Sequence, residues 1–119
     1  MPMRGITVAA ARKLLLALKG VKPGTSYGLP SFMLQDKFFA RFRDDDTVLV
    51  LMLGSIDDRD VLMQMDPKAF FFTDHYKNYP AVLIRLADIT SARLAETLQV
   101  AWEDLSAKRA PKKQRPRKR

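Results

Sequence analysis

An almost continuously apolar stretch from Thr47 to Leu53 limits the fold more than any other part of the sequence. A strand reads this way when both of its faces are covered, so the stretch predicts an interior strand near the centre of a sheet. It follows Asp44 to Asp46, a run of typical turn residues. The segment before them, Lys37 to Arg43, alternates with the two-residue period of a strand. Together the two segments predict neighbouring strands in an antiparallel meander.

The alternation from Lys37 to Arg43 divides the side chains into two sets. One side carries Phe38, Ala40 and Phe42, which we expect to face the core, and the other carries Lys37, Phe39, Arg41 and Arg43. Exposed aromatic rings flanked by cations offer single-stranded nucleic acid a stacking surface and a track of positive charge. The alternative is that Phe39 lies beneath a helix while the cations form surface ion pairs with the aspartates of the turn.

Helical periodicity marks three other segments. Thr7 to about Lys19 and Ser91 to about Lys108 repeat apolar residues at spacings of three and four, and Thr90 is placed to cap the second of them. A shorter helix begins at Ser55 and extends to about Met65. Its inward residues are expected to be Val61, Leu62 and Met65, and Trp102 of the last helix is expected in the core.

The order of these elements predicts the fold class. Short strands are expected at Phe70 to Thr73 and Val82 to Leu86, with a loop from Asp74 to Pro80 between them. The order is therefore helix, three or four strands, helix, two strands, helix. This order predicts an α+β fold, a two-layer sandwich in which the N- and C-terminal helices pack on one face of an antiparallel sheet.

Positive charge is concentrated at the end of the chain. The net charge is +8, and residues 108–119 hold eight basic side chains and no acid: Lys108, Arg109, Lys112, Lys113, Arg115, Arg117, Lys118 and Arg119. We expect residues 1–109 to form one domain and residues 110–119 to be a disordered basic tail, because the tail has too few apolar groups to offset its ordering entropy. Such a tail binds phosphate backbones without sequence preference. The alternative is a solubilising or incidental tail.

The sequence lacks the residues that several kinds of catalytic and metal-binding site require. The chain has no cysteine and one histidine, which excludes thiol chemistry and sites built from several histidines. Carboxylates gather at Asp44 to Asp46 and Asp57 to Asp60 without the spacing of a calcium loop. We therefore expect no catalytic residues, cofactor or metal, and no enzymatic activity. No apolar run approaches the length of a membrane span. We expect a monomer in the cytoplasm. The alternative for its location is that the N-terminal segment, which contains no acidic residue, is a transit peptide.

Short motifs along the chain resemble one known family. They are Gly24-Thr-Ser-Tyr27-Gly28-Leu-Pro30-Ser-Phe32, Lys37-Phe38-Phe39-Ala40, Asp66-Pro67 before Phe70-Phe71, Thr73-Asp74-His75-Tyr76, Tyr79-Pro80-Ala-Val82-Leu83-Ile84-Arg85-Leu86, Ala101-Trp102 and Lys108-Arg109. Because these motifs occur together in this order, the chain resembles the MmcQ/YjbR family over about residues 7–109. The resemblance implies a fold like that of the bacterial frataxin homologues (CyaY/frataxin-like) and a DNA-binding role. Frataxins bind iron through acidic residues of the first helix, and residues 1–35 contain no acid, so we do not expect iron binding by that route.

Two hypotheses for function follow. The first is a non-specific, largely electrostatic DNA-binding protein that uses the basic tail with Lys37, Arg41 and Arg43. The second is a non-enzymatic binding module for a protein partner or a small acidic ligand, built around Tyr27, His75, Tyr79 and Arg85. For His75 the competing interpretation is that the ring holds its loop by hydrogen bonds to backbone carbonyls.

Overall fold

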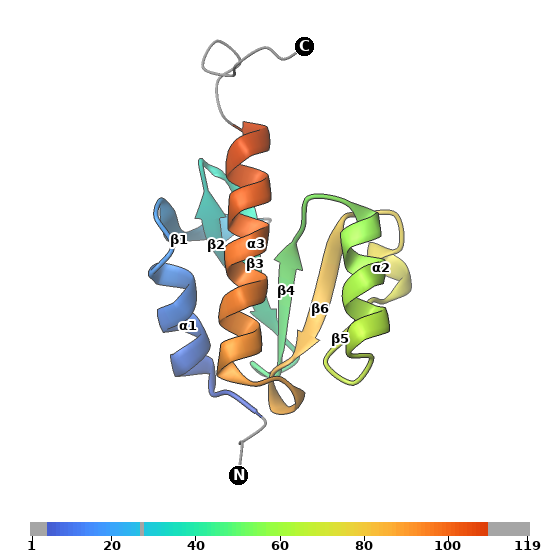
Figure 1. Ribbon diagram of the computed structural model, residues 1–119. Coiled ribbons are helices and arrows are strands. Elements are labelled where there is room, and N and C mark those ends of the chain that lie inside the picture. The colour runs from blue at the N-terminus through green and yellow to red at the C-terminus, as the bar shows by residue number, and fades with distance from the viewer. Residues whose placement is uncertain (1–4, 27, 110–119) are drawn as a thin grey trace, which may run out of the picture.

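The computed structural model describes residues 5–26 and 28–109 (Figure 1). Six strands form one antiparallel sheet in the order β1-β2-β3-β4-β6-β5 within this part of the chain. The strands are β1 (Val21–Ser26), β2 (Leu29–Leu34), β3 (Lys37–Arg43), β4 (Val48–Met52), β5 (Phe70–Phe71) and β6 (Ala81–Arg85). The helices are α1 (Val8–Leu16), α2 (Ile56–Met65) and α3 (Ser91–Arg109), and two short 3-10 turns are η1 (Asp74–Tyr76) and η2 (Leu86–Asp88). The predicted α+β fold with an antiparallel sheet is confirmed.

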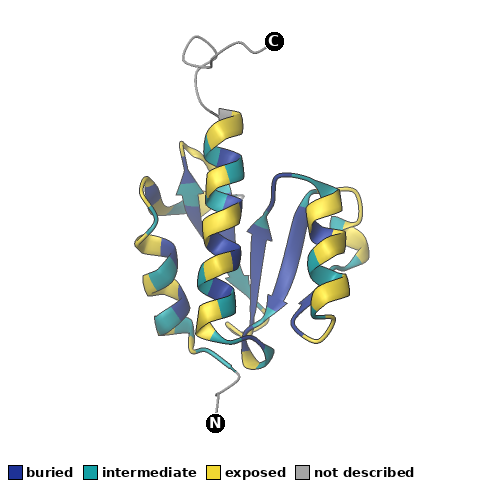
Figure 2. Ribbon diagram, in the orientation of Figure 1, coloured by how far each residue is buried: buried dark blue, intermediate teal, exposed yellow. Residues whose placement is uncertain are grey.

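The main core lies between the sheet and the helices, which cover one of its faces (Figure 1). Leu49 and Leu51 of β4 belong to this core, and Val48 and Val50 belong to a second cluster on the opposite face. The central strand is therefore buried on both sides, and its ribbon is coloured mostly as buried in Figure 2. Leu15 of α1 and Leu98 of α3 are among the side chains that cover the helix side. Full burial of each such aliphatic side chain stabilises the fold by roughly 1.5–3 kcal/mol. The prediction that the terminal helices share one face is confirmed.

Hydroxyl side chains cap the helices as the sequence indicates. The backbone N–H groups of Ala10, Asp58 and Arg93 each donate to the side-chain oxygen three residues earlier, at 3.1 Å, from Thr7, Ser55 and Thr90. The first helix ends at Leu16 rather than Lys19, and Gly20 then turns the chain with a φ of 83°. The indole Nε1 of Trp102 donates to the carbonyl of Lys19 at 2.7 Å and joins α3 to the segment after α1. Trp102 was expected in the core; it is half-buried and packs against the edge of the core.

A β-bulge changes the faces predicted for β3. Phe32 pairs with Ala40 and Met33 pairs with Phe38, which leaves Phe39 as an extra residue between two paired positions. Phe39 and Ala40 both belong to the main core, whereas Phe38 packs on the opposite face. The expectation that Phe38 faces the main core with Ala40 and Phe42 was therefore wrong, because a strict two-residue period does not continue through a bulge. The alternative that placed Phe39 in the core is confirmed.

The second face of the sheet, opposite the helices, has a smaller apolar cluster of its own. Val48, Val50 and Leu83 are buried there, and Phe38, Phe71 and Tyr76 pack against them. Tyr76 belongs to η1, so the connection between β5 and β6 folds over part of this face. The described residues contain no helix that meets the length and hydropathy needed to cross a membrane.

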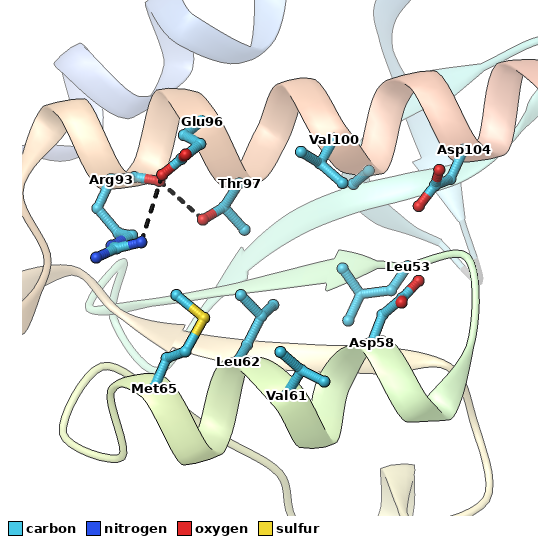
Figure 3. A pocket seen from close by; sticks show the side chains of 11 residues that line it. Leu53, Asp58, Val61, Leu62, Met65, Arg93, Glu96, Thr97, Val100 and Asp104 are labelled. Atoms are coloured by element: carbon cyan, nitrogen blue, oxygen red, sulfur yellow. Dashed lines mark hydrogen bonds and ion pairs between the residues drawn. The ribbon is translucent and has the colours of Figure 1, made fainter.

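The orientation of α2 also differs from expectation. Val61 and Met65 are 55% and 54% exposed, so the prediction that they face inward was wrong, while Leu62 is half-buried against the core. Helical spacing places Arg59 on the same inward side as Leu62 and Met63. Val61 and Met65 instead point toward α3 across an open groove (Figure 3).

Candidate functional site

A pocket of about 430 Å³ opens on the second face of the sheet. Its walls are Ser26, Leu29, Phe38, Arg41, Met52, His75, Tyr76 and Tyr79, and we call it the sheet-face pocket. These residues come from the adjoining ends of β1 and β2, from β3, from the end of β4 and from the η1 connection. The volume lies in the range typical of small-molecule sites. Among the described lining residues, arginine and histidine supply the ionisable nitrogen groups and no carboxylate is present.

Three aromatic rings form the outer wall of this pocket. The His75 and Tyr76 ring centroids are 4.7 Å apart in an edge-to-face arrangement, and those of His75 and Tyr79 are 6.2 Å apart at an interplanar angle of 33°. Tyr76 packs on the sheet, whereas His75 is exposed and Tyr79 is 53% exposed. The rings of His75 and Tyr79 are therefore accessible beside the pocket, and accessible aromatic rings can stack on a planar ligand.

Arg41 supplies the positive charge of the pocket. It lies on β3, one residue beyond the bulge segment Phe39–Ala40, and points to the second face. One of its terminal nitrogens donates to the hydroxyl oxygen of Tyr76 at 3.5 Å, and the side chain is half-buried. A guanidinium held in this way can form paired hydrogen bonds with a phosphate or carboxylate group.

Arg59 holds the η1 connection, which carries His75, Tyr76 and Tyr79 and which we call the aromatic loop. This role of Arg59 was not recognised from the sequence. Arg59 is 4% exposed, and Nη1 donates to the carbonyls of Tyr76, Lys77 and Tyr79 at 3.1, 3.2 and 3.3 Å. The guanidinium carbon lies 4.0 Å from the centroid of the Phe72 ring. In the sequence Arg59 stands between aspartates and looks like a surface charge; its spacing of three and four residues from Leu62 and Met63 was the available signal.

The structure brings some of the predicted ligand-binding residues together and separates others. His75 and Tyr79 line the same pocket, and Arg41 joins them there. Arg85 does not line it: Nη1 of Arg85 donates to the carbonyl of Lys68 at 2.7 Å, and its guanidinium lies 4.0 Å from the Phe71 ring centroid. Arg85 therefore holds the segment before β5. The carbonyls of the η1 connection are bound by Arg59, which takes the role that the competing interpretation gave to His75.

The predicted nucleic-acid residues of the domain fall in different places. Lys37 is exposed at the start of β3, and Arg43 forms an ion pair of 3.2 Å with Asp44, as the surface-pair alternative expected. Lys108 donates from Nζ to the carbonyl of Gly54, which joins the end of α3 to the loop after β4.

The remaining candidates lie outside the described part of the chain. These are Tyr27, Lys112, Lys113, Arg115, Arg117, Lys118 and Arg119, together with the side chain of Arg109. The basic tail and the place of Tyr27 in the pocket stay predictions. Within the described ranges, no three side chains of His, Asp or Glu gather in a way that suits a metal ion.

Comparison with known proteins decides the family. The model of the YjbR family matches residues 16–104, which is most of the chain. The chain belongs to the YjbR family. All described residues of the sheet-face pocket lie inside the matched range.

Individual relatives of this YjbR protein carry little functional information. Uncharacterized proteins of Mycobacterium tuberculosis and Mycobacterium bovis are each 44% identical to it over 41 residues. This segment is 34% of the present chain and 32% of each relative, so the match spans about a third of their length. No solved structure matches the chain significantly. The likeness to bacterial frataxin homologues therefore stays a prediction.

Proposed function

We propose that this YjbR protein binds DNA, and that it holds a single-stranded segment on the second face of its sheet. The sheet-face pocket takes an unpaired base, and Arg41 binds the phosphate next to that base. The observation that carries the proposal is the combination of Arg41 with the rings of His75, Tyr76 and Tyr79 around one pocket whose described walls contain no carboxylate.

Stacking supplies the contact with the base. Single-strand binding proteins combine exposed aromatic rings with a cationic track, and each stacked base contributes about 1–3 kcal/mol. The exposed rings of His75 and Tyr79 suit this role, and the floor formed by Phe38 and Met52 is apolar. Stacking of this kind tolerates any base, so it favours non-specific binding.

The basic tail supplies the long-range attraction. Residues 110–119 contain six lysines and arginines and no acid. They follow the end of α3, where Lys108 binds the carbonyl of Gly54, two residues after the pocket residue Met52. The end of α3 therefore lies near the end of β4 that also forms the pocket. Counterion release by the tail and stacking in the pocket are two separable contributions to affinity.

Variants of the pocket test the stacking contribution. Tyr79→Ala and Arg41→Gln are each expected to weaken binding to a fluorescein-labelled oligothymidine by about tenfold, or 1.4 kcal/mol, in an anisotropy titration. Lys13→Gln is the matched control, because it removes one exposed positive charge from α1 on the other side of the sheet. Equal affinities of the two pocket variants and the control would contradict the proposed use of the pocket.

Removal of residues 110–119 tests the electrostatic contribution. The slope of log affinity against log salt concentration is expected to become shallower by about 0.7 for each single-strand phosphate that the shortened chain no longer neutralises. The shortened chain is expected to keep a weaker affinity that depends on Tyr79. If neither the full nor the shortened chain binds DNA at about 50 mM salt, the DNA proposal is wrong. The pocket would then be better explained by a small acidic ligand that uses the same Arg41.

A further inference from the structure

A second concave site lies on the helix side of the molecule, between α2 and α3. This α2–α3 groove has a volume of about 260 Å³ (Figure 3). Val61 and Met65 of α2 face Val100 of α3 across it, with Leu62 between them. It shares no described residue with the sheet-face pocket.

Three large apolar side chains that line the groove are exposed. Val61, Met65 and Val100 are 55%, 54% and 51% exposed, although α3 itself buries Leu94, Leu98 and Leu105 completely or nearly so. Single exposed apolar residues are common on protein surfaces, but three that face one depression form a continuous patch. Such a patch between two helices has the shape that receives the apolar side of a third helix.

Charges at the two ends of the groove differ. Asp58 and Asp104 converge at the end near Gly54, where a Cβ atom added to that glycine would lie 3.2 and 3.1 Å from their Oδ2 atoms. At the other end Arg93 pairs with Glu96 at 3.4 Å. The described lining thus holds three carboxylates and one guanidinium. Lys108 of the chain itself lies at the end near Gly54, where its Nζ donates to the carbonyl of Gly54. With this cation counted, the groove keeps an excess of one negative charge, which favours a positively charged partner whose cation lies near Asp58 and Asp104.

We infer that the α2–α3 groove binds one amphipathic, basic helix of a partner protein. The apolar side of this helix packs on Val61, Met65 and Val100, and a lysine or arginine near one of its ends binds Asp58 and Asp104. From Arg93 to Asp104 the axis of α3 rises about 16 Å, so the groove accommodates about three turns of the partner. A second copy of this chain suits the groove less well, because two such surfaces would bring six carboxylates together with two guanidinium groups.

Two synthetic peptides test this inference on the full chain. Each is a helical peptide of about 14 residues with leucines at positions i, i+4 and i+7, and they differ only in lysines or glutamates at both ends. The wild-type protein is expected to bind the lysine peptide at least about tenfold more tightly than the glutamate peptide. The double variant Asp58→Lys/Asp104→Lys is expected to reverse this order. The same preference in both proteins would contradict the inference.

Two further measurements do not depend on the charge variants. The lysine peptide is expected to shift the methyl NMR signals of Val61, Met65 and Val100 in the wild-type protein, and Val100→Asp is expected to weaken its binding about tenfold. Absence of methyl shifts at about 1 mM peptide would overturn the inference. Analytical ultracentrifugation gives a second way to overturn it. If the free wild-type protein sediments as a dimer and the Val100→Asp variant sediments as a monomer, the groove holds a second copy of the chain.

Discussion

Replacement of Phe39 by alanine is expected to lower the free energy of unfolding by about 3–5 kcal/mol, as for other buried phenylalanines. The Phe39 side chain is fully buried in the main core, where the bulge in β3 directs it toward the helix side of the sheet. Its removal takes away apolar packing and leaves a cavity. The cavity cannot close easily, because β3 is hydrogen-bonded to β2 on one side and to β4 on the other. Urea denaturation followed by circular dichroism measures the change.

Phe38 provides the matched control for this prediction. It has the same chemistry and stands one residue earlier, but it is half-buried on the second face of the sheet. Phe38→Ala is expected to cost about 1–2 kcal/mol, because less apolar area returns to water. A larger loss for Phe38→Ala than for Phe39→Ala would show that the strand follows the strict alternation and has no bulge at this position.

Replacement of Arg59 by leucine is expected to lower the free energy of unfolding by about 3 kcal/mol, because three carbonyls lose their hydrogen bonds to an almost fully buried charged donor. The carbonyls of Tyr76, Lys77 and Tyr79 all accept from this one guanidinium, and leucine has no donor to offer them. Unlike Phe39→Ala, this change is expected to loosen one segment in particular. Hydrogen exchange of the backbone amides of residues 76–79 and of Ala81 is expected to become faster than that of β4.

The control for Arg59 lies on the same helix. Gln64 of α2 is exposed, and Gln64→Leu is expected to change stability by less than about 0.5 kcal/mol. Arg59→Lys keeps the charge and three donors but lacks the planar guanidinium above the Phe72 ring, so an intermediate loss is expected. Unchanged amide exchange in Arg59→Leu would mean that the aromatic loop is held by its packing on the sheet alone.

The parts of the fold that sequence could predict are those set by local patterns. The apolar run that became β4, the helical periodicity of α3 and the capping residues Thr7, Ser55 and Thr90 all depend on neighbours within a few positions. The bulge at Phe39 depends on the register with β2, which is a long-range property. Likewise, helical spacing groups Val61 with Met65, but only the packing of α2 decides which of its sides faces the core.

The candidate site was predictable residue by residue but not as an arrangement. His75, Tyr79 and Arg41 were each recognisable as polar or aromatic groups suited to binding. Arg41 meets Tyr76 across 35 residues of sequence, a contact that no short motif encodes. The sequence hypotheses placed Arg41 among the nucleic-acid residues and Arg85 beside His75 and Tyr79 in the ligand site. Only the structure shows that Arg41 lines the pocket and that Arg85 binds the carbonyl of Lys68.

The two outermost strands of the sheet have a consequence for self-association. An open sheet can recruit a foreign strand through the unpaired main-chain groups at either margin, which is a route to amyloid-like growth. At one margin β1 contains Pro23, which has no N–H to donate, next to the exposed Lys22; at the other, β5 is only two residues long. Both margins are poor templates for strand addition. The protein is therefore expected to stay free of fibrils at the high concentrations that NMR requires.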